Sequence, residues 1–356
     1  MTQQVVHQQQ TFERTPIISG VWLPIVLYGG LSAALVVALL WSMVSGRYHV
    51  PVDHVIAILA AHIMDVTPTW TPIERIVVEV VRLPRVLTAA VAGAGLSLCG
   101  AVLQGLFRNP LVGPQTIGVS SGAALGGVTA ILFFGFSIFV QVGAFVGAAA
   151  ALLAVLAIHR SDSLSPILTL VLAGVVVSAF CSALVGLVTY IADPETKLPD
   201  IVFWLLGSFA SATWWKVMLL SVCTAASGVV LIGMRWRINV LSLGDEDART
   251  LGVHPARDRL ILLTATCLAI SAQVGVSGTI GWVGLVIPNL ARIIVGADHR
   301  RLLPISTLMG AVFLVVADTL ARDLTAAEIP VGIVTAIVGT PVFAYLLRRN
   351  ATSKTP

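Results

Sequence analysis

Long apolar runs separated by short polar segments make up most of the chain. A helix needs about 20 predominantly apolar residues to cross a membrane, and the runs provide for ten such crossings. The pattern therefore predicts an all-α membrane protein with ten transmembrane helices. The predicted crossings are residues 21–45, 86–107, two helices within 109–159 that divide near 135–137, 165–192, 213–234, two helices within 260–290, 302–320 and 331–347.

The segments between and beside the crossings also carry information. Residues 201–209 are apolar but too short to span, which is typical of a surface or re-entrant helix. Residues 241–255 alternate helix-forming and acidic residues with Gly244 and Gly252 between them, which predicts two short helices joined by a turn. Residues 1–20 are polar and lack the basic start and short apolar core of a signal peptide. We expect tails at 1–20 and 351–356 around a membrane domain at 21–350.

Composition agrees with a membrane environment. Hydrophobic residues make up 57% and charged residues only 11% of the chain, against about 25% charged residues in an average soluble domain. The net charge of +4 comes from scattered basic residues, so a nucleic-acid surface is not indicated and membrane lipid is the expected surrounding. With both termini cytoplasmic, fourteen of the 21 Lys and Arg residues lie inside and seven outside, which favours this orientation.

The second to fifth and the seventh to tenth crossings would form two halves that enter the membrane from opposite sides. An inverted repeat of this kind is a common plan of transporters. Residues 93–110 and 275–289 support it, because each is a Gly-rich stretch that ends in an Asn/Pro pair. Chance similarity between two Gly-rich membrane helices explains the same pattern, so both explanations stay open.

No catalytic or cofactor chemistry is indicated. The phosphate-binding pattern Gly-x-x-x-x-Gly-Lys-Ser/Thr does not occur, so any ATP hydrolysis must come from another chain, and this chain is expected not to be an enzyme. The first eight crossings carry no charge near their centres, which argues against an ion-coupled secondary transporter. A structural membrane subunit is a further alternative. The four cysteines (Cys99, Cys181, Cys223 and Cys267) lack metal-site spacing, so we expect no metal and no bound cofactor.

Several motifs occur in a fixed order between about residues 80 and 348. The chain resembles the iron-siderophore, haem and vitamin B12 permeases, the FecCD-type membrane subunits of type II ABC importers. The resemblance implies ten helices per subunit, a homodimer, two cytoplasmic ATPase subunits that hold ATP and Mg, and an external substrate-binding protein. It favours a ferric siderophore or haem as cargo, with cobalamin as an alternative. The motifs lie at Arg82–Val86, 93–95, 100–104, Arg108–Leu111, 118–124, 172–175, 243–253, 327–332 and 339–343.

The resemblance assigns the polar loop to coupling with the ATPase. Leu243 and Leu251 would fill apolar pockets of the ATPase. An ordinary polar loop is the alternative. The proposed coupling residues are Leu243, Gly244, Asp245, Glu246, Asp247, Arg249, Leu251 and Gly252, of which Asp245, Glu246, Asp247 and Arg249 would make contacts at the rim.

Arg82, Arg85 and Arg322 are expected on the outer side, where the charge bias disfavours them. The resemblance implies that they pair with carboxylates of the binding protein, while anchoring to lipid headgroups is the alternative. Asp318, four residues before Arg322, is placed for a local ion pair.

Two further groups are candidates for the transport pathway. Asn109, Pro110 and Leu111 follow the second crossing, and the resemblance implies that they narrow its inner mouth; a simple turn is the alternative. The second group, Ser178, Cys181 and Ser182, shares one face of the fifth crossing and lies either along the pathway at the dimer axis or in small-residue helix packing. The resemblance departs at Gln115, where relatives often carry an acidic residue.

Overall fold

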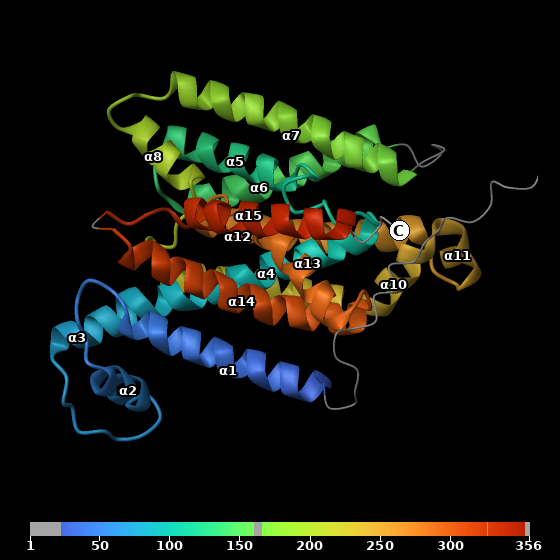
Figure 1. Cartoon of the computed structure of the whole chain (residues 1–356). Coiled ribbons are helices and arrows are strands. Elements are labelled where there is room, and N and C mark those ends of the chain that lie inside the picture. The colour runs from blue at the N-terminus through green and yellow to red at the C-terminus, as the bar shows by residue number, and fades with distance from the viewer. Residues whose placement is uncertain (1–22, 160–165, 326, 353–356) are drawn as a thin grey trace, which may run out of the picture.

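Helices account for every regular element in the described part of the chain, as the sequence predicts. The computed structural model describes residues 23–159, 166–325 and 327–352 (Figure 1). The predicted tail at 1–20 lies outside the described residues. The helices are α1 (Leu23–Val44), α2 (Val52–Ala60), α3 (Pro72–Ile76), the π-helical turn η1 (Val77–Arg82), α4 (Leu83–Leu106), α5 (Val119–Phe134), α6 (Ile138–Ile158), α7 (Pro166–Ile191), α8 (Lys197–Leu205), α9 (Trp214–Gly233), α10 (Arg235–Leu243), α11 (Asp245–Thr250), α12 (Pro255–Ser277), α13 (Val283–Val295), α14 (His299–Asp323) and α15 (Val331–Thr352).

Among the described residues, eight helices are long and apolar enough to cross a membrane, and α5 and α13 are shorter apolar helices. Together they occupy the places of the ten predicted crossings, although the number that crosses stays a prediction. The break between α5 and α6 falls at 135–137 as expected, since Gly135 takes a left-handed conformation with a positive φ there. The first described residues of α1 lie at the same end of the bundle as α10, α11 and the last turns of α15 (Figure 1).

The helix that contains the second predicted crossing is longer than the apolar run. A continuous helical segment begins at Pro72, fourteen residues before the predicted start, and runs through α3, η1 and α4 to Leu106. The charges that interrupt the apolar run are satisfied along the helix. Thr71 and Glu74 form a capping box, and Arg75 pairs with Glu79 one turn later at 3.1 Å.

The two predicted halves pack against each other. α4 packs against α13 and α14, and α12, the first helix of the second predicted half, packs against α5 and α6; the inverted repeat itself stays a prediction. These two helices are the most buried of the membrane spans. Glycines allow the closest approaches: a Cβ added at Gly93 would collide with the backbone of Gly310, and one added at Gly100 with that of Gly284.

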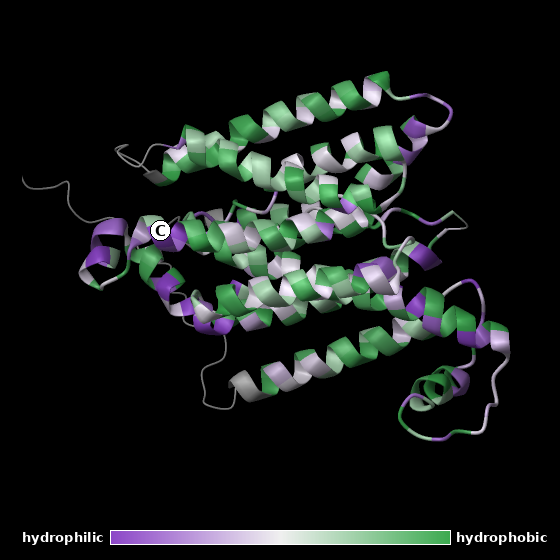
Figure 2. Ribbon diagram, turned by 180° about the vertical axis from the view of Figure 1, so that it is seen from behind, coloured by the Kyte–Doolittle hydropathy of each residue, from purple (hydrophilic) through white to green (hydrophobic). Residues whose placement is uncertain are grey.

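α1 and α7 lie at the edges of the bundle and consist largely of apolar residues (Figure 2). On α7, Phe180 is 64% exposed and Tyr190 is 87% exposed. Because exposing so large an apolar surface to water is unfavourable, lipid or another subunit must cover these helices.

Candidate functional site

α10 and α11 form a small cap at one end of the bundle. Two short helices were predicted within 241–255, but α10 begins six residues earlier, at Arg235, and only α11 lies wholly within that segment. Gly244 separates the two helices with a positive φ, and Gly252 ends α11 in the left-handed region. The N–H of Val253 donates to the carbonyl of Ala248 at 2.9 Å, which closes the last turn. Ala248 is fully buried and fixes α11 to the bundle.

Two leucines flank α11 and point away from the bundle. Leu243 is 58% exposed and Leu251 is 52% exposed. The charged residues Glu246, Asp247 and Arg249 on α11 are also exposed. Exposed leucines beside exposed charges are compatible with a protein-binding surface, and the coupling role itself stays a prediction.

Asp245 is bonded within the chain, and its predicted contact with the ATPase stays a prediction. Its carboxylate accepts a hydrogen bond from Arg108 at 2.8 Å and two from Arg259, one of them at 2.7 Å. The bonds from Arg259, and the positive charges of Arg259 and Arg108, hold the pKa of the Asp245 carboxyl below its ordinary value. Asp245 therefore joins α11 to the end of α4 and to α12.

The loop after α4 carries the predicted gate residues and is tied to α13. The side chain of Asn109 accepts the N–H of Leu111 at 2.9 Å, which fixes the turn. The carbonyl of Pro110 accepts from the amide of Asn289 at 3.0 Å. Arg292 extends this contact, since it donates to the side chain of Asn289 at 2.9 Å. Leu111 remains 48% exposed at the tip of the loop.

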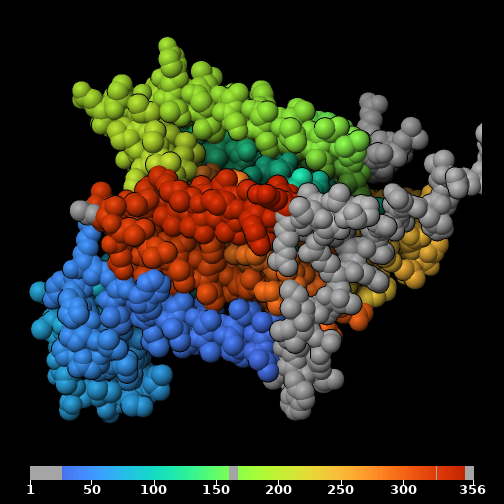
Figure 3. Space-filling view, viewed as in Figure 1, coloured from blue at the N-terminus to red at the C-terminus, as the bar shows by residue number. Residues whose placement is uncertain are grey.

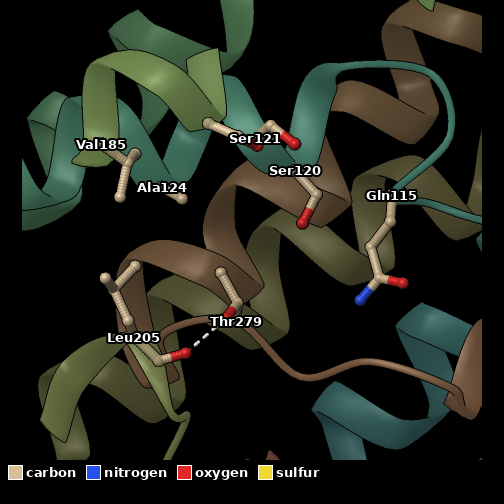
Figure 4. Close-up of a pocket in the computed structure, with 8 residues that line it drawn as sticks. Gln115, Ser120, Ser121, Ala124, Val185, Leu205 and Thr279 are labelled. Carbon is tan, nitrogen blue, oxygen red and sulfur yellow. Dashed lines mark hydrogen bonds between the residues drawn. The ribbon is translucent and has the colours of Figure 1, made fainter. Parts of the chain in front are cut away.

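A cavity of about 250 Å³ opens between α5, α7, α8 and the turn after α12. Hydroxyl groups and the amide of Gln115 give it its polar character, and Thr279 donates to the carbonyl of Leu205 at its floor (Figure 4). A second space of about 70 Å³ lies between the gate loop and the turn before α13 and shares Gln115. The larger cavity is lined by Gln115, Ser120, Ser121, Ala124, Ser182, Val185, Leu205 and Thr279.

The predicted pathway residues divide between these spaces and the core. Leu111 lines the smaller space and Ser182 the larger cavity, while the hydroxyl of Ser178 donates to the backbone carbonyl of Gln115 at 3.2 Å. Cys181 lines neither and packs in the hydrophobic core at 7% exposure, so its predicted place on the pathway is not supported by the structure.

Most of the lining residues were missed as site residues, among them Gln115 and Trp282. Gln115 carried a signal, because it departs from the family pattern, but Trp282 carried none. Trp282 stands before α13 with a left-handed backbone that is unusual for a bulky residue. Its ring lies 6.3 Å from that of Phe343 between centroids. Backbone conformation and ring contacts of this kind are not visible in one sequence.

The predicted docking arginines are buried within the bundle and do not stand free on its surface. Arg85 is 6% exposed and forms three hydrogen bonds of 2.9–3.1 Å with the fully buried carboxylate of Asp318. It also donates to Glu328 at 2.8 Å. A buried guanidinium must have such partners, because leaving it unpaired costs several kcal/mol (about 3–5).

Arg82 and Arg322 are held in the same region. Arg82 donates to the carbonyl of Met43 at 2.6 Å and to that of Val44 at 3.0 Å, which ties it to the end of α1. Arg322 donates to the carbonyl and the hydroxyl of Ser42 and lies 3.5 Å from Asp318, the predicted local ion pair. The three arginines therefore hold α1, α4 and α14 together, and docking of a binding protein on them stays an untested prediction.

Comparison with known proteins agrees with this architecture. The profile of the FecCD transport family matches residues 34–349. The chain is 44% identical over 329 residues to the molybdate import system permease protein MolB of Haemophilus influenzae, covering 91% of this chain and 95% of the relative. It is 45% identical over 275 residues to an iron chelatin transport system permease protein of Helicobacter pylori, covering 77% and 83% of the two chains.

A solved structure is also similar over nearly its whole length. It is a metal-chelate type ABC transporter in an inward-facing conformation, with a TM-score of 0.81, 42% sequence identity and coverage of 92% of this chain and 99% of that chain. The family match covers far more than half of the sequence, and the solved relative shares the fold. The chain belongs to the FecCD transport family and is the multi-pass membrane permease subunit of an ABC importer.

Proposed function

We propose that two copies of this chain form the pathway of an importer that carries a bulky metal chelate, a ferric siderophore or haem, across the bacterial inner membrane. Two ATPase subunits would bind the α10–α11 cap, and a substrate-binding protein would deliver the cargo at the opposite end. One observation carries the ATPase contact: Leu243 and Leu251 are more than half exposed on either side of α11. Both termini and the α10–α11 cap are then cytoplasmic.

The ATPase contact follows from the division of labour within such importers. The sequence carries no phosphate-binding loop, so the energy of ATP must reach the pathway through a protein contact. ATP and Mg would stay on the ATPase, and this chain would bind neither. Two exposed leucines beside a short, firmly seated helix supply a small apolar contact that a cleft on the ATPase can enclose.

Pairing with a second copy is supported by the exposed helices. α7 and α15 present apolar side chains on the surface, among them Phe180 and Ile337, which is 67% exposed. In the space-filling view α7 and α15 stand as two raised edges, with α5 visible between them (Figure 3). The larger cavity opens beside α7, so a second copy placed against α7 would complete its wall.

The cargo is the least constrained part of the proposal. The larger cavity is lined by hydroxyl and amide groups together with apolar side chains, and none of its lining residues is charged. Such a surface passes a large chelate without binding it tightly. Cobalamin is the alternative within the same class. Molybdate is a second candidate, because the relative named as a molybdate permease matches over 95% of its own length.

Uptake into proteoliposomes tests the proposal. The chain, its ATPase and its binding protein would be reconstituted, and ATP-dependent accumulation of a labelled ferric siderophore, haem, cobalamin and molybdate would be compared. Accumulation of one cargo only when ATP and the binding protein are both present is the expected result. Uptake driven by an ion gradient without the ATPase would refute the importer assignment, and selective uptake of molybdate would refute the chelate.

A further inference from the structure

Arg108 occupies the joint between the gate loop and the α10–α11 cap. It is the second residue after α4 and has a left-handed backbone with a positive φ. This conformation is unfavourable for a residue other than glycine, because its Cβ approaches the following carbonyl oxygen. Contacts of the Arg108 side chain with the cap offset that cost.

The guanidinium of Arg108 holds both short helices of the cap. Its Nε donates to the carbonyl of Leu241 in α10 at 3.2 Å, and its Nη2 donates to Oδ1 of Asp245, the first residue of α11, at 2.8 Å. Asp245 is held from the other side by Arg259 of α12. The carboxylate is therefore clamped between two cations, and neither short helix can move away from Arg108 without breaking a charged hydrogen bond.

Beyond Arg108, the main chain leads directly into the gate loop. Leu111 is only three residues further on and lines the smaller space together with Trp282. The turn between Arg108 and Leu111 is fixed by Asn109 and by the hydrogen bond from Asn289 to the carbonyl of Pro110. Because this short segment is held at both ends, a displacement of Arg108 is passed on to Leu111 instead of being absorbed by a slack loop.

We propose that the Arg108–Asp245 ion pair is the mechanical link that transmits movement of α11 to the gate loop at residues 109–111. Arg108 and Asp245 are then positioning residues. They touch no cargo, and their contact converts a shift of the docked cap into a shift of Leu111. The proposal rests on the proposed docking of the ATPase at Leu243 and Leu251, and it assigns Asp245 a different task from those two leucines.

The pair joining Arg237 to Asp258 serves as a matched control. It lies in the same cap, has the same kind of contact at 2.9 Å, and joins α10 to α12 without touching the gate loop. The acids differ in burial, since the Asp258 side chain is 1% exposed and that of Asp245 is 23% exposed. Arg237→Gln therefore leaves a buried carboxylate without its partner and should cost the cap at least as much stability as Arg108→Gln. A loss of general stability in the cap would therefore affect both pairs, whereas loss of the link would affect only Arg108.

The experiment compares Arg108→Gln and Arg237→Gln in the complete complex with its ATPase, reconstituted in proteoliposomes. We expect Arg108→Gln to retain the ATPase on co-purification and to keep its ATP hydrolysis, while cargo transported per ATP falls at least tenfold. Arg237→Gln should stay within about twofold of the parent. Arg108→Lys, which keeps the charge, should recover part of the coupling and remains testable if the Arg108→Gln chain itself does not fold.

A labelling measurement reports the gate directly. The variant carries Leu111→Cys, and its four native cysteines are replaced. The rate at which the new thiol reacts with a charged maleimide should change severalfold when ATP and vanadate are added. That response should disappear with Arg108→Gln and persist with Arg237→Gln. A preserved response, or normal transport per ATP, would overturn the link. Loss of the ATPase from Arg108→Gln would also overturn it, because Arg108 would then be a docking residue, whereas loss of binding in the parent complex would refute the proposed function itself.

Discussion

Replacing Arg85 by leucine tests whether the arginines at the α2–α3 end stabilise the bundle or bind a partner. The substitution removes three hydrogen bonds to Asp318 and one to Glu328. It leaves the Asp318 carboxylate fully buried, with Arg322 at 3.5 Å as its remaining charged partner. We therefore expect Arg85→Leu to lower the stability of the bundle more than it weakens the binding of the binding protein.

The magnitude follows from burial. Removing one partner of a buried ion pair costs about 3–5 kcal/mol, because the other charge is left without compensation. Arg322 still offsets part of the charge, and Glu328 is one-third exposed and can be hydrated, so we expect the lower end, about 3 kcal/mol. An exposed pair would lose only about 0.2–1 kcal/mol. A buried structural pair and an exposed docking residue thus predict losses of unfolding free energy that differ several-fold.

The assay is equilibrium unfolding in mixed micelles, with SDS as the denaturant and tryptophan fluorescence as the signal. Arg75→Ala is the control, since Arg75 forms an exposed pair of 3.1 Å with Glu79 on the same helix and should cost below about 0.5 kcal/mol. The double variant Arg85→Leu with Asp318→Leu should lose about 2 kcal/mol less unfolding free energy than the two single variants lose together. Unchanged stability of Arg85→Leu together with lost binding of the loaded binding protein would refute the reasoning and restore the docking role.

Three further predictions concern the cap and the helix packing. Leu243→Asp or Leu251→Asp should abolish co-purification of the ATPase while the purified chain unfolds as before, because both side chains are exposed; retained co-purification would contradict the coupling role. The stability contributed by the ionised Asp245 is present above its ordinary pKa of 3.8 and lost as pH falls through its lowered pKa. The parent and Asp245→Asn should therefore converge in acid unfolding curves, and a gap that persists in acid would argue against the ion pairs. Gly100→Ala should cost about 1–3 kcal/mol, because the added methyl group meets the backbone of Gly284; Gly30→Ala, which faces open space, should cost nothing in the same denaturation assay.

Sequence reasoning located the helices well because the length of an apolar run is a local property. α6, α7 and α9 begin and end within a few residues of the prediction, and the two short helices of the cap follow from Gly244 and Gly252. The helical extension before the second crossing was missed because charges at Glu74 and Arg85 were taken to end the helix. Local capping and distant partners satisfy those charges inside it.

The site was predicted less completely, since its contacts are long-range. Arg85 meets Asp318 across 233 positions and Arg108 meets Asp245 across 137. No periodicity or spacing in one sequence reveals such pairs, so Arg82, Arg85 and Arg322 were assigned to a binding protein or to lipid headgroups, and Asp245 to the rim of the ATPase contact. Leu243 and Leu251 were placed correctly on the surface because apolar residues within a polar segment have few places to be buried.

The pairing of Arg85 also sets an order on the assembly of the protein during synthesis. Arg82 finds its carbonyl partners in residues that precede it, so it can be satisfied as soon as α4 is made. Arg85 has to wait for Asp318, 233 residues later, which at ribosomal rates of about 5–20 residues per second is roughly 10–50 s. Until then the end of α4 carries an uncompensated cation. The Arg85 end of this central helix therefore cannot take its final place until α14 has emerged, which makes its seating a late event in the biogenesis of the permease.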